Sequence, residues 1–189
     1  MPRAFLLDCF DSFTHNVACG LVAAGAEVQV ARADRCSVAD VAASAPDLLV
    51  LSPGPGRPED ARLAQELVAA FAGRVPLLGI CLGMQVLATA FGGRVDRSPQ
   101  PVHGKVSRVD HDGSGLFADL PQGLEVGRYH SLCVVEVPPV LRANAWTPEG
   151  LVMGLRHREL ALAGVQFHPD SFLTPMGLSF FRHALQGRL

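Results

Sequence analysis

The sequence lacks the marks of an exported or membrane-embedded protein. No apolar run approaches the roughly 20 residues that a membrane-spanning helix needs. The apolar run near the N-terminus, AFLL, is too short for a secretory signal, and acidic residues follow it at once. The five cysteines are odd in number and form no C-x-x-C pair, so neither a disulfide framework nor a zinc site is expected. We expect a cytoplasmic protein with free thiols.

The sequence also has no large excess of either positive or negative charge. Charged residues make up 18% of the 189 residues, the formal net charge is -2, and no long run of like charge occurs. We therefore expect neither a nucleic-acid partner nor a membrane surface. Hydrophobic residues make up 49% of the chain, and no repeat or low-complexity tract interrupts them. This composition fits a single domain that covers residues 1–189.

Apolar runs alternate with segments of helical period along the first half of the chain. Strands are expected at 4–10, 27–33, 47–52 and 75–80, and helices at 12–25, 37–44, 57–73 and directly after residue 80. The alternation predicts an α/β fold, with a mostly parallel open sheet and helices on both faces. Short strand-like segments follow between 94 and 167, so a small antiparallel sheet is expected at one edge, and a last helix at 176–186.

One cysteine stands in a distinctive setting. In LLGICLGMQ (77–85), Cys81 lies between an expected buried strand and an expected helix, with Gly79 and Gly83 on either side. Such glycines allow the sharp turn of a nucleophile elbow, here with Cys in place of Ser. The thiol then lies at the carboxyl end of the sheet and at a helix N-terminus, where the helix dipole favours a thiolate. A buried structural cysteine is the alternative, but this setting favours a nucleophile.

A cysteine nucleophile needs a base, and His168 is the leading candidate among seven histidines. It follows an apolar strand in GVQFHPDSF, and Asp170 lies two residues further on. A carboxylate in that place can fix the tautomer of the imidazole and stabilise the imidazolium. Taken alone, a His-x-Asp triplet is more simply a surface turn, but its combination with Cys81 favours a catalytic Cys-His-Asp triad.

Acyl transfer also requires hydrogen-bond donors for the oxyanion. The turn PGPG (53–56) follows another expected buried strand and therefore lies at the same edge of the sheet as Cys81. The main-chain N–H groups of Gly54 and Leu82 are the candidate donors. A plain turn or a phosphate-binding loop is the alternative, although PGPGRP lacks the Lys-Ser/Thr of a P-loop.

These motifs, taken in order, resemble those of a known family. SPGPG, GICLGMQ and the later FHP are similar to segments of class I (triad-type) glutamine amidotransferases, which have a flavodoxin-like α/β fold. LDCFDSFTHN, HGK (103–105) and RYHSL (128–132) resemble one branch, the glutaminase subunits (component II) of anthranilate synthase and aminodeoxychorismate synthase. The similarity extends from residue 7 to about residue 177, which is nearly the whole chain.

The resemblance implies a role for each matched residue. Cys81 attacks the carboxamide of glutamine to form a thioester, and His168 protonates the leaving ammonia and then activates water. Gly54 and Leu82 hold the oxyanion. The positions that match the family's glutamine-binding residues are Gly56, Gln85, Ser131 and Leu132.

The resemblance also implies a partner. Ammonia is passed through a channel to a chorismate-binding synthase subunit (component I), which makes anthranilate or 4-amino-4-deoxychorismate, so the chain is expected to act in a heteromer. No cofactor and no metal are expected on this chain, because the partner carries the Mg²⁺ of the synthase reaction.

One departure from the family pattern leaves alternatives open. The family usually has Glu at the position of Asp170, whose side chain is one methylene shorter. A catalytically weak regulatory subunit is therefore one alternative interpretation. Another is a different α/β cysteine hydrolase, such as a gamma-glutamyl peptidase or an amidase, although RYHSL and HGK argue against it.

Overall fold

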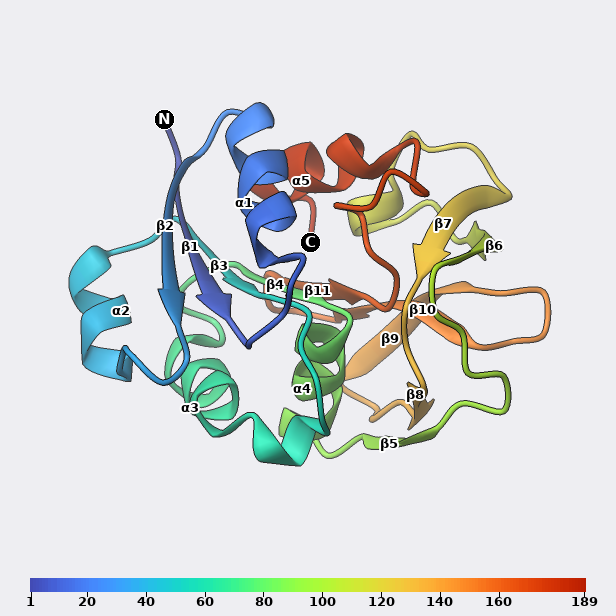
Figure 1. Cartoon of the computed structure of the whole chain (residues 1–189), viewed down its shortest axis with the longest axis horizontal. Helices are drawn as coiled ribbons and strands as arrows, with labels where there is room; N and C mark the ends of the chain where they lie inside the picture. Colours follow the sequence, from blue (N-terminus) through green and yellow to red (C-terminus); the bar gives the residue numbers. More distant parts are fainter.

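The computed structural model describes residues 1–189, and its centre is a sheet of nine strands (Figure 1). Five neighbouring strands pair in parallel. In order across the sheet they are β2 (Glu27–Arg32), β1 (Arg3–Asp8), β3 (Leu48–Leu51), β4 (Leu77–Ile80) and β11 (Leu162–Val165). β3, β4 and β11 are buried along their whole length, because helices cover both faces of a parallel sheet. The prediction of a mostly parallel sheet is confirmed.

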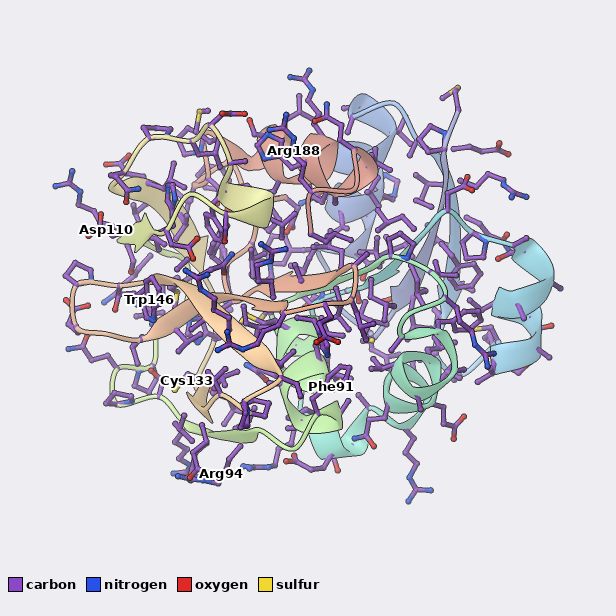
Figure 2. The ribbon with its side chains drawn as sticks, turned by 180° about the vertical axis from the view of Figure 1, so that it is seen from behind. Phe91, Arg94, Asp110, Cys133, Trp146 and Arg188 are labelled. Carbon is purple, nitrogen blue, oxygen red and sulfur yellow. The ribbon has the colours of Figure 1, made fainter.

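The antiparallel strands lie on one side of this parallel half. Beyond β11 the sheet continues with β10 (Val152–His157), β9 (Leu141–Trp146), β6 (Lys105–His111) and β7 (Leu124–Arg128). A separate two-stranded antiparallel sheet is formed by β5 (Arg94–Arg97) and β8 (Leu132–Glu136). Figure 2 shows Arg94 and Cys133, from these two strands, in the lower left of the view. The predicted antiparallel edge is confirmed, and most of it extends the main sheet.

Helices cover both faces of the sheet. α1 (Thr14–Ala23) and α5 (Gly177–Leu185) lie on one face, and α2 (Val38–Ser44), α3 (Arg62–Phe71) and α4 (Leu82–Ala90) lie on the other (Figure 1). Successive side chains of β1 alternate between the two apolar clusters, with Leu6 packed on the first face and Leu7 on the second. None of the helices has the length and apolar composition that crossing a membrane requires.

The expected helix at 57–73 differs from the structure. It divides into a short 3-10 helix, η1 (Pro58–Asp60), and α3, because Ala61 has a ψ of 61° that no α-helix contains. A second 3-10 helix, η2 (Gly115–Phe117), precedes β7. The predicted helix at 176–186 corresponds to α5. The predicted site lies at the carboxyl ends of the parallel strands, and these differences do not affect that part of the fold.

Candidate active site

Cys81 occupies a sharp turn between β4 and α4. Its φ of 54° and ψ of -104° lie in a region that side-chain-bearing residues rarely adopt, at a typical cost of about 1–3 kcal/mol. Its main-chain N–H donates to the carbonyl of Val165 at 2.8 Å, which extends the pairing of β4 with β11. The surrounding sheet therefore holds the thiol, which is 7% exposed, at the carboxyl end of the parallel strands.

Two close backbone approaches shape this turn. A Cβ atom on Gly83 would collide with the carbonyl oxygen of Leu51, so only glycine lets the first turn of α4 lie against β3. A Cβ on Gly54 would lie 2.5 Å from the carbonyl oxygen of Cys9, so the loop after β3 needs glycine to lie against the loop after β1. Both glycines bring main-chain N–H groups to the same edge of the sheet as Cys81.

A cavity of about 160 Å³ opens at this edge. It unites Cys81 with both predicted oxyanion donors and with all four predicted glutamine-binding residues. Its lining consists of Gly54, Pro55, Gly56, Cys81, Leu82, Gln85, Tyr129, His130, Ser131 and Leu132. A larger, more apolar cavity of about 340 Å³ lies beyond the wall formed by Pro55 and Leu82, but Cys81 does not line it. The smaller cavity is therefore the candidate active site.

His168 reaches the same edge of the sheet from β11, the strand next to β4. Its side chain is 2% exposed. The rings of Phe13 and Tyr129 pack edge-on against the imidazole, with centroids at 5.5 Å and 4.9 Å. Burial lowers the pKa of His168, but the neighbouring Asp170 and Cys81 side chains outweigh it and raise this pKa well above its usual value of 6.5. The protonated imidazole is thus stabilised beside the sulfur.

Asp170 lies behind the imidazole, and the contact between them is long. Asp170 Oδ1 is 3.5 Å from His168 Nδ1, and the Asp170 side chain is completely buried. Neither carboxylate oxygen has a hydrogen-bond partner, and neither does Nδ1. A well-formed N–H···O bond spans about 2.7–3.2 Å, so the contact between Asp170 and His168 is a close pairing of charges without an aligned hydrogen bond. The structure brings all three predicted triad residues together, and their catalytic roles remain predictions.

The structure adds two residues that the sequence analysis did not identify. The side chain of Gln166 is fully buried, and its Nε2 donates to Cys81 Sγ at 3.6 Å. Tyr129 lines the cavity, and its hydroxyl shares a hydrogen bond of 2.9 Å with Ser171 Oγ. The sequence does contain a sign of Gln166: it is a lone amide in the apolar run before FHP. An amide buried in such a strand needs polar partners, which points to a polar site nearby.

No group of three or more His, Cys, Asp or Glu side chains is arranged to hold a metal ion. The five cysteines are free thiols, and Cys9 differs from Cys81 in its chemistry. Burial raises the pKa of Cys9 to about 12, which makes it a poor nucleophile at neutral pH. The chemistry of the cavity therefore centres on Cys81.

The fold and the site define a class: an open-sheet α/β protein with a buried cysteine at a strand-to-helix turn and a histidine after the neighbouring parallel strand. The family model "Glutamine amidotransferase class-I" matches residues 5–186, and the chain belongs to this family.

Two relatives agree with this assignment, and a solved structure has the same fold. Anthranilate synthase component 2 of Thermus thermophilus is 46% identical over 187 residues, which cover 97% of this chain and 92% of that protein. Aminodeoxychorismate synthase component 2 of Escherichia coli is 44% identical over 174 residues, covering 91% and 93%. The crystal structure of a Thermoplasma acidophilum chain described as a GMP synthase subunit superposes with a TM-score of 0.90, at 23% identity, over 99% of this chain and 94% of that one. The last similarity concerns the fold alone.

Proposed function

We propose that this chain is the glutaminase subunit of a chorismate-aminating synthase: it hydrolyses L-glutamine and supplies the ammonia to a component I subunit. The observation that carries the proposal is the position of Cys81 and His168, which follow two neighbouring parallel strands, in a chain of the class-I amidotransferase family. Related chains named component 2 of anthranilate synthase and of aminodeoxychorismate synthase support this choice of partner.

The first half of the proposed reaction forms a thioester. The Cys81 thiolate adds to the carboxamide carbon of glutamine, and the resulting oxyanion accepts hydrogen bonds from the N–H groups of Gly54 and Leu82. The protonated His168 then gives its proton to the amide nitrogen as the C–N bond breaks, so that ammonia leaves. The raised pKa of His168 suits this step, because the imidazolium is the acid that the leaving group requires.

The second half releases glutamate. His168, now neutral, takes a proton from water, and the hydroxide adds to the thioester carbon in the same oxyanion site. The C–S bond breaks, glutamate leaves, and the thiolate–imidazolium pair is restored. Asp170 stabilises the imidazolium throughout by its charge. Substrate glutamine is held in the 160 Å³ cavity, by the residues Gly56, Gln85, Ser131 and Leu132.

Ammonia release tests the proposal directly. Wild type is assayed with L-glutamine, with and without chorismate and its component I partner, and the aminated product is identified by mass spectrometry. We expect glutamine-dependent amine with wild type and none with Cys81→Ser, whereas added ammonium salt should restore product because it bypasses the glutaminase. Cys19→Ser, at an exposed thiol, is the matched control and should keep full activity.

The same assay contains the outcomes that contradict the proposal. Glutamine-dependent amine from Cys81→Ser would exclude Cys81 as the nucleophile. Faster hydrolysis of gamma-glutamyl peptides than of glutamine would instead favour a cysteine peptidase. No ammonia with any chorismate-using partner would favour a regulatory subunit.

A further inference from the structure

The side chain of Gln166 connects the Cys81 sulfur to a buried polar network. Gln166 follows β11 directly, and its amide is 0% exposed. Its Nε2 lies 3.6 Å from Cys81 Sγ, and its Oε1 accepts a hydrogen bond of 3.1 Å from Gln85 Nε2. The mechanism above gives Gln166 no role, yet it is a polar group in contact with the reacting atom.

The main-chain oxygen of Leu132, which can only accept hydrogen bonds, determines the orientation of both side-chain amides. Gln85 Nε2 lies 3.2 Å from the main-chain oxygen of Leu132, so this end of the Gln85 amide must be the NH₂ group. The same NH₂ faces the Gln166 side chain, so the nearer end of the Gln166 amide must be its oxygen. The NH₂ group of Gln166 is then left facing the sulfur. A flipped Gln166 would set two NH₂ groups against each other.

A second fixed group holds the other end of the network. Arg128, which is 3% exposed, can only donate, and its Nε donates to His130 Nε2 at 2.9 Å. The hydrogen of the neutral His130 ring is therefore on Nδ1, which donates to the Leu132 oxygen at 2.8 Å. Two donors thus hold the Leu132 carbonyl in place, and this carbonyl orients Gln85.

We propose that Gln166 is a further catalytic residue, whose side-chain NH₂ donates to the Cys81 sulfur and stabilises the thiolate. The inference rests on the proposed role of Cys81 as the nucleophile. An N–H donor favours a thiolate over a thiol, because hydrogen bonds to charged groups are the stronger ones. The same bond stabilises the thiolate again when it leaves the thioester.

Other titratable or charged groups also lie near the sulfur, and the test must leave them unchanged. His168 faces it from the end of β11, with Asp170 behind the imidazole. His130 lines the same cavity and is joined to the network through the Leu132 carbonyl, and Arg128 donates to His130 from behind it. Substitutions at Gln166 leave all four groups in the chain, so a changed reactivity of Cys81 reports on the amide.

The experiment is alkylation of the full chain by iodoacetamide, without glutamine or partner, between about pH 5 and about pH 9. The Cys81 adduct is quantified by peptide mass spectrometry, which separates it from the other four thiols. Gln166→Met keeps an unbranched side chain of similar size without a donor. We expect it to slow alkylation of Cys81 about tenfold near neutral pH and to move the pH dependence to higher pH.

Three further variants complete the test. Gln166→Glu places a carboxylate beside the sulfur and should slow alkylation further, because like charge disfavours the thiolate. Gln85→Met removes the group that orients Gln166 and should slow alkylation less than Gln166→Met does. Gln29→Met, on the exposed edge strand β2, is the matched control and should react as wild type.

The inference is overturned if Gln166→Met is alkylated at the wild-type rate. If Gln166→Met does not fold, wild-type rates in both Gln166→Glu and Gln85→Met would overturn it. Retained glutamine hydrolysis together with such rates would refute it and leave the proposed function intact. If alkylation depends on Gln166 but the chain releases no ammonia, the inference about Gln166 is supported and the proposed function is refuted.

Discussion

Asp170 determines how well His168 is held. Its carboxylate is buried, lacks hydrogen bonds and lies 3.5 Å from the imidazole nitrogen. A side chain one methylene longer reaches further toward Nδ1 and can form the aligned hydrogen bond that is missing here.

We predict that Asp170→Glu raises kcat/KM for glutamine about fivefold, since one well-formed hydrogen bond contributes about 1 kcal/mol. Asp170→Asn, which keeps the shape but removes the charge, should lower kcat about 10²- to 10⁴-fold. Both are measured as glutamine-dependent ammonia release with the partner present. Full activity in Asp170→Asn would show that the imidazole needs no carboxylate.

His130 makes the stability of the folded chain depend on pH. Burial first, and then the charge of Arg128, lower the pKa of His130 from 6.5 to about 4. The unfolded chain therefore binds this proton between pH 6.5 and 4 while the folded chain does not, so stability is lost as pH falls through this range. His168, whose pKa is raised, is protonated in both states below pH 6.5 and does not offset this loss.

We predict that this one group costs about 2 kcal/mol of unfolding free energy between about pH 7 and about pH 5. The His130→Asn variant has no imidazole to protonate. Between the two pH values, its unfolding free energy should therefore fall by about 2 kcal/mol less than that of the wild type. Urea unfolding of both proteins at the two pH values gives the difference. Equal pH dependence in the two chains would mean that His130 titrates normally in the folded state.

At the scale of elements, the junction of β4 and α4 tolerates no added atoms. We predict that Gly83→Ala lowers the free energy of unfolding by about 3 kcal/mol, because its Cβ meets the backbone of β3 and the sheet must shift. Gly25→Ala is the matched control: Gly25 has a φ of 103° but open space around it, so only backbone strain of about 1 kcal/mol is expected. Urea denaturation compares them, and equal losses would show that packing at the elbow is loose.

Local patterns in the sequence predict some elements well and others poorly. The strands β3 and β4 are found from sequence because burial on both faces leaves continuous apolar runs. The break in the helix at Ala61 cannot be found from sequence, because the helical periodicity of the surrounding residues continues across it. The order of the antiparallel strands depends on pairing between distant segments, such as β6 with β9, and no local pattern encodes it.

The candidate site shows the same division. Cys81 and His168 can be proposed from sequence because glycine and proline mark the turns in which they lie. Gln166 and Tyr129 cannot, because their importance comes from what they touch. The Gln166 contact with Cys81 joins positions 85 residues apart, and only the register of β11 on β4 brings them together.

For the whole molecule, we propose that residues 1–189 unfold as one unit. Both apolar clusters contain side chains from the parallel strands and from the antiparallel ones, for example Leu6 with Val126 in one and Leu49 with Leu155 in the other. Neither half can therefore open without exposing the core of the other.

The single tryptophan allows a direct test of this cooperativity. Trp146 lies on β9 in the antiparallel half (Figure 2), whereas four of the five α-helices belong to the first 90 residues. We predict that urea transitions followed by Trp146 fluorescence and by far-ultraviolet circular dichroism have the same midpoint. Two separate midpoints would show that the halves are independent.

The neighbouring positions of β4 and β11 also have a consequence for biosynthesis. A ribosome that has translated the chain as far as α4 has produced the thiol, yet the imidazole is encoded 87 codons after it. Until that late strand emerges and inserts beside its neighbour, a growing polypeptide carries Cys81 without the histidine that we propose as its acid–base group. With the roles proposed for Cys81 and His168, we expect unfinished chains to be unable to consume the cell's glutamine.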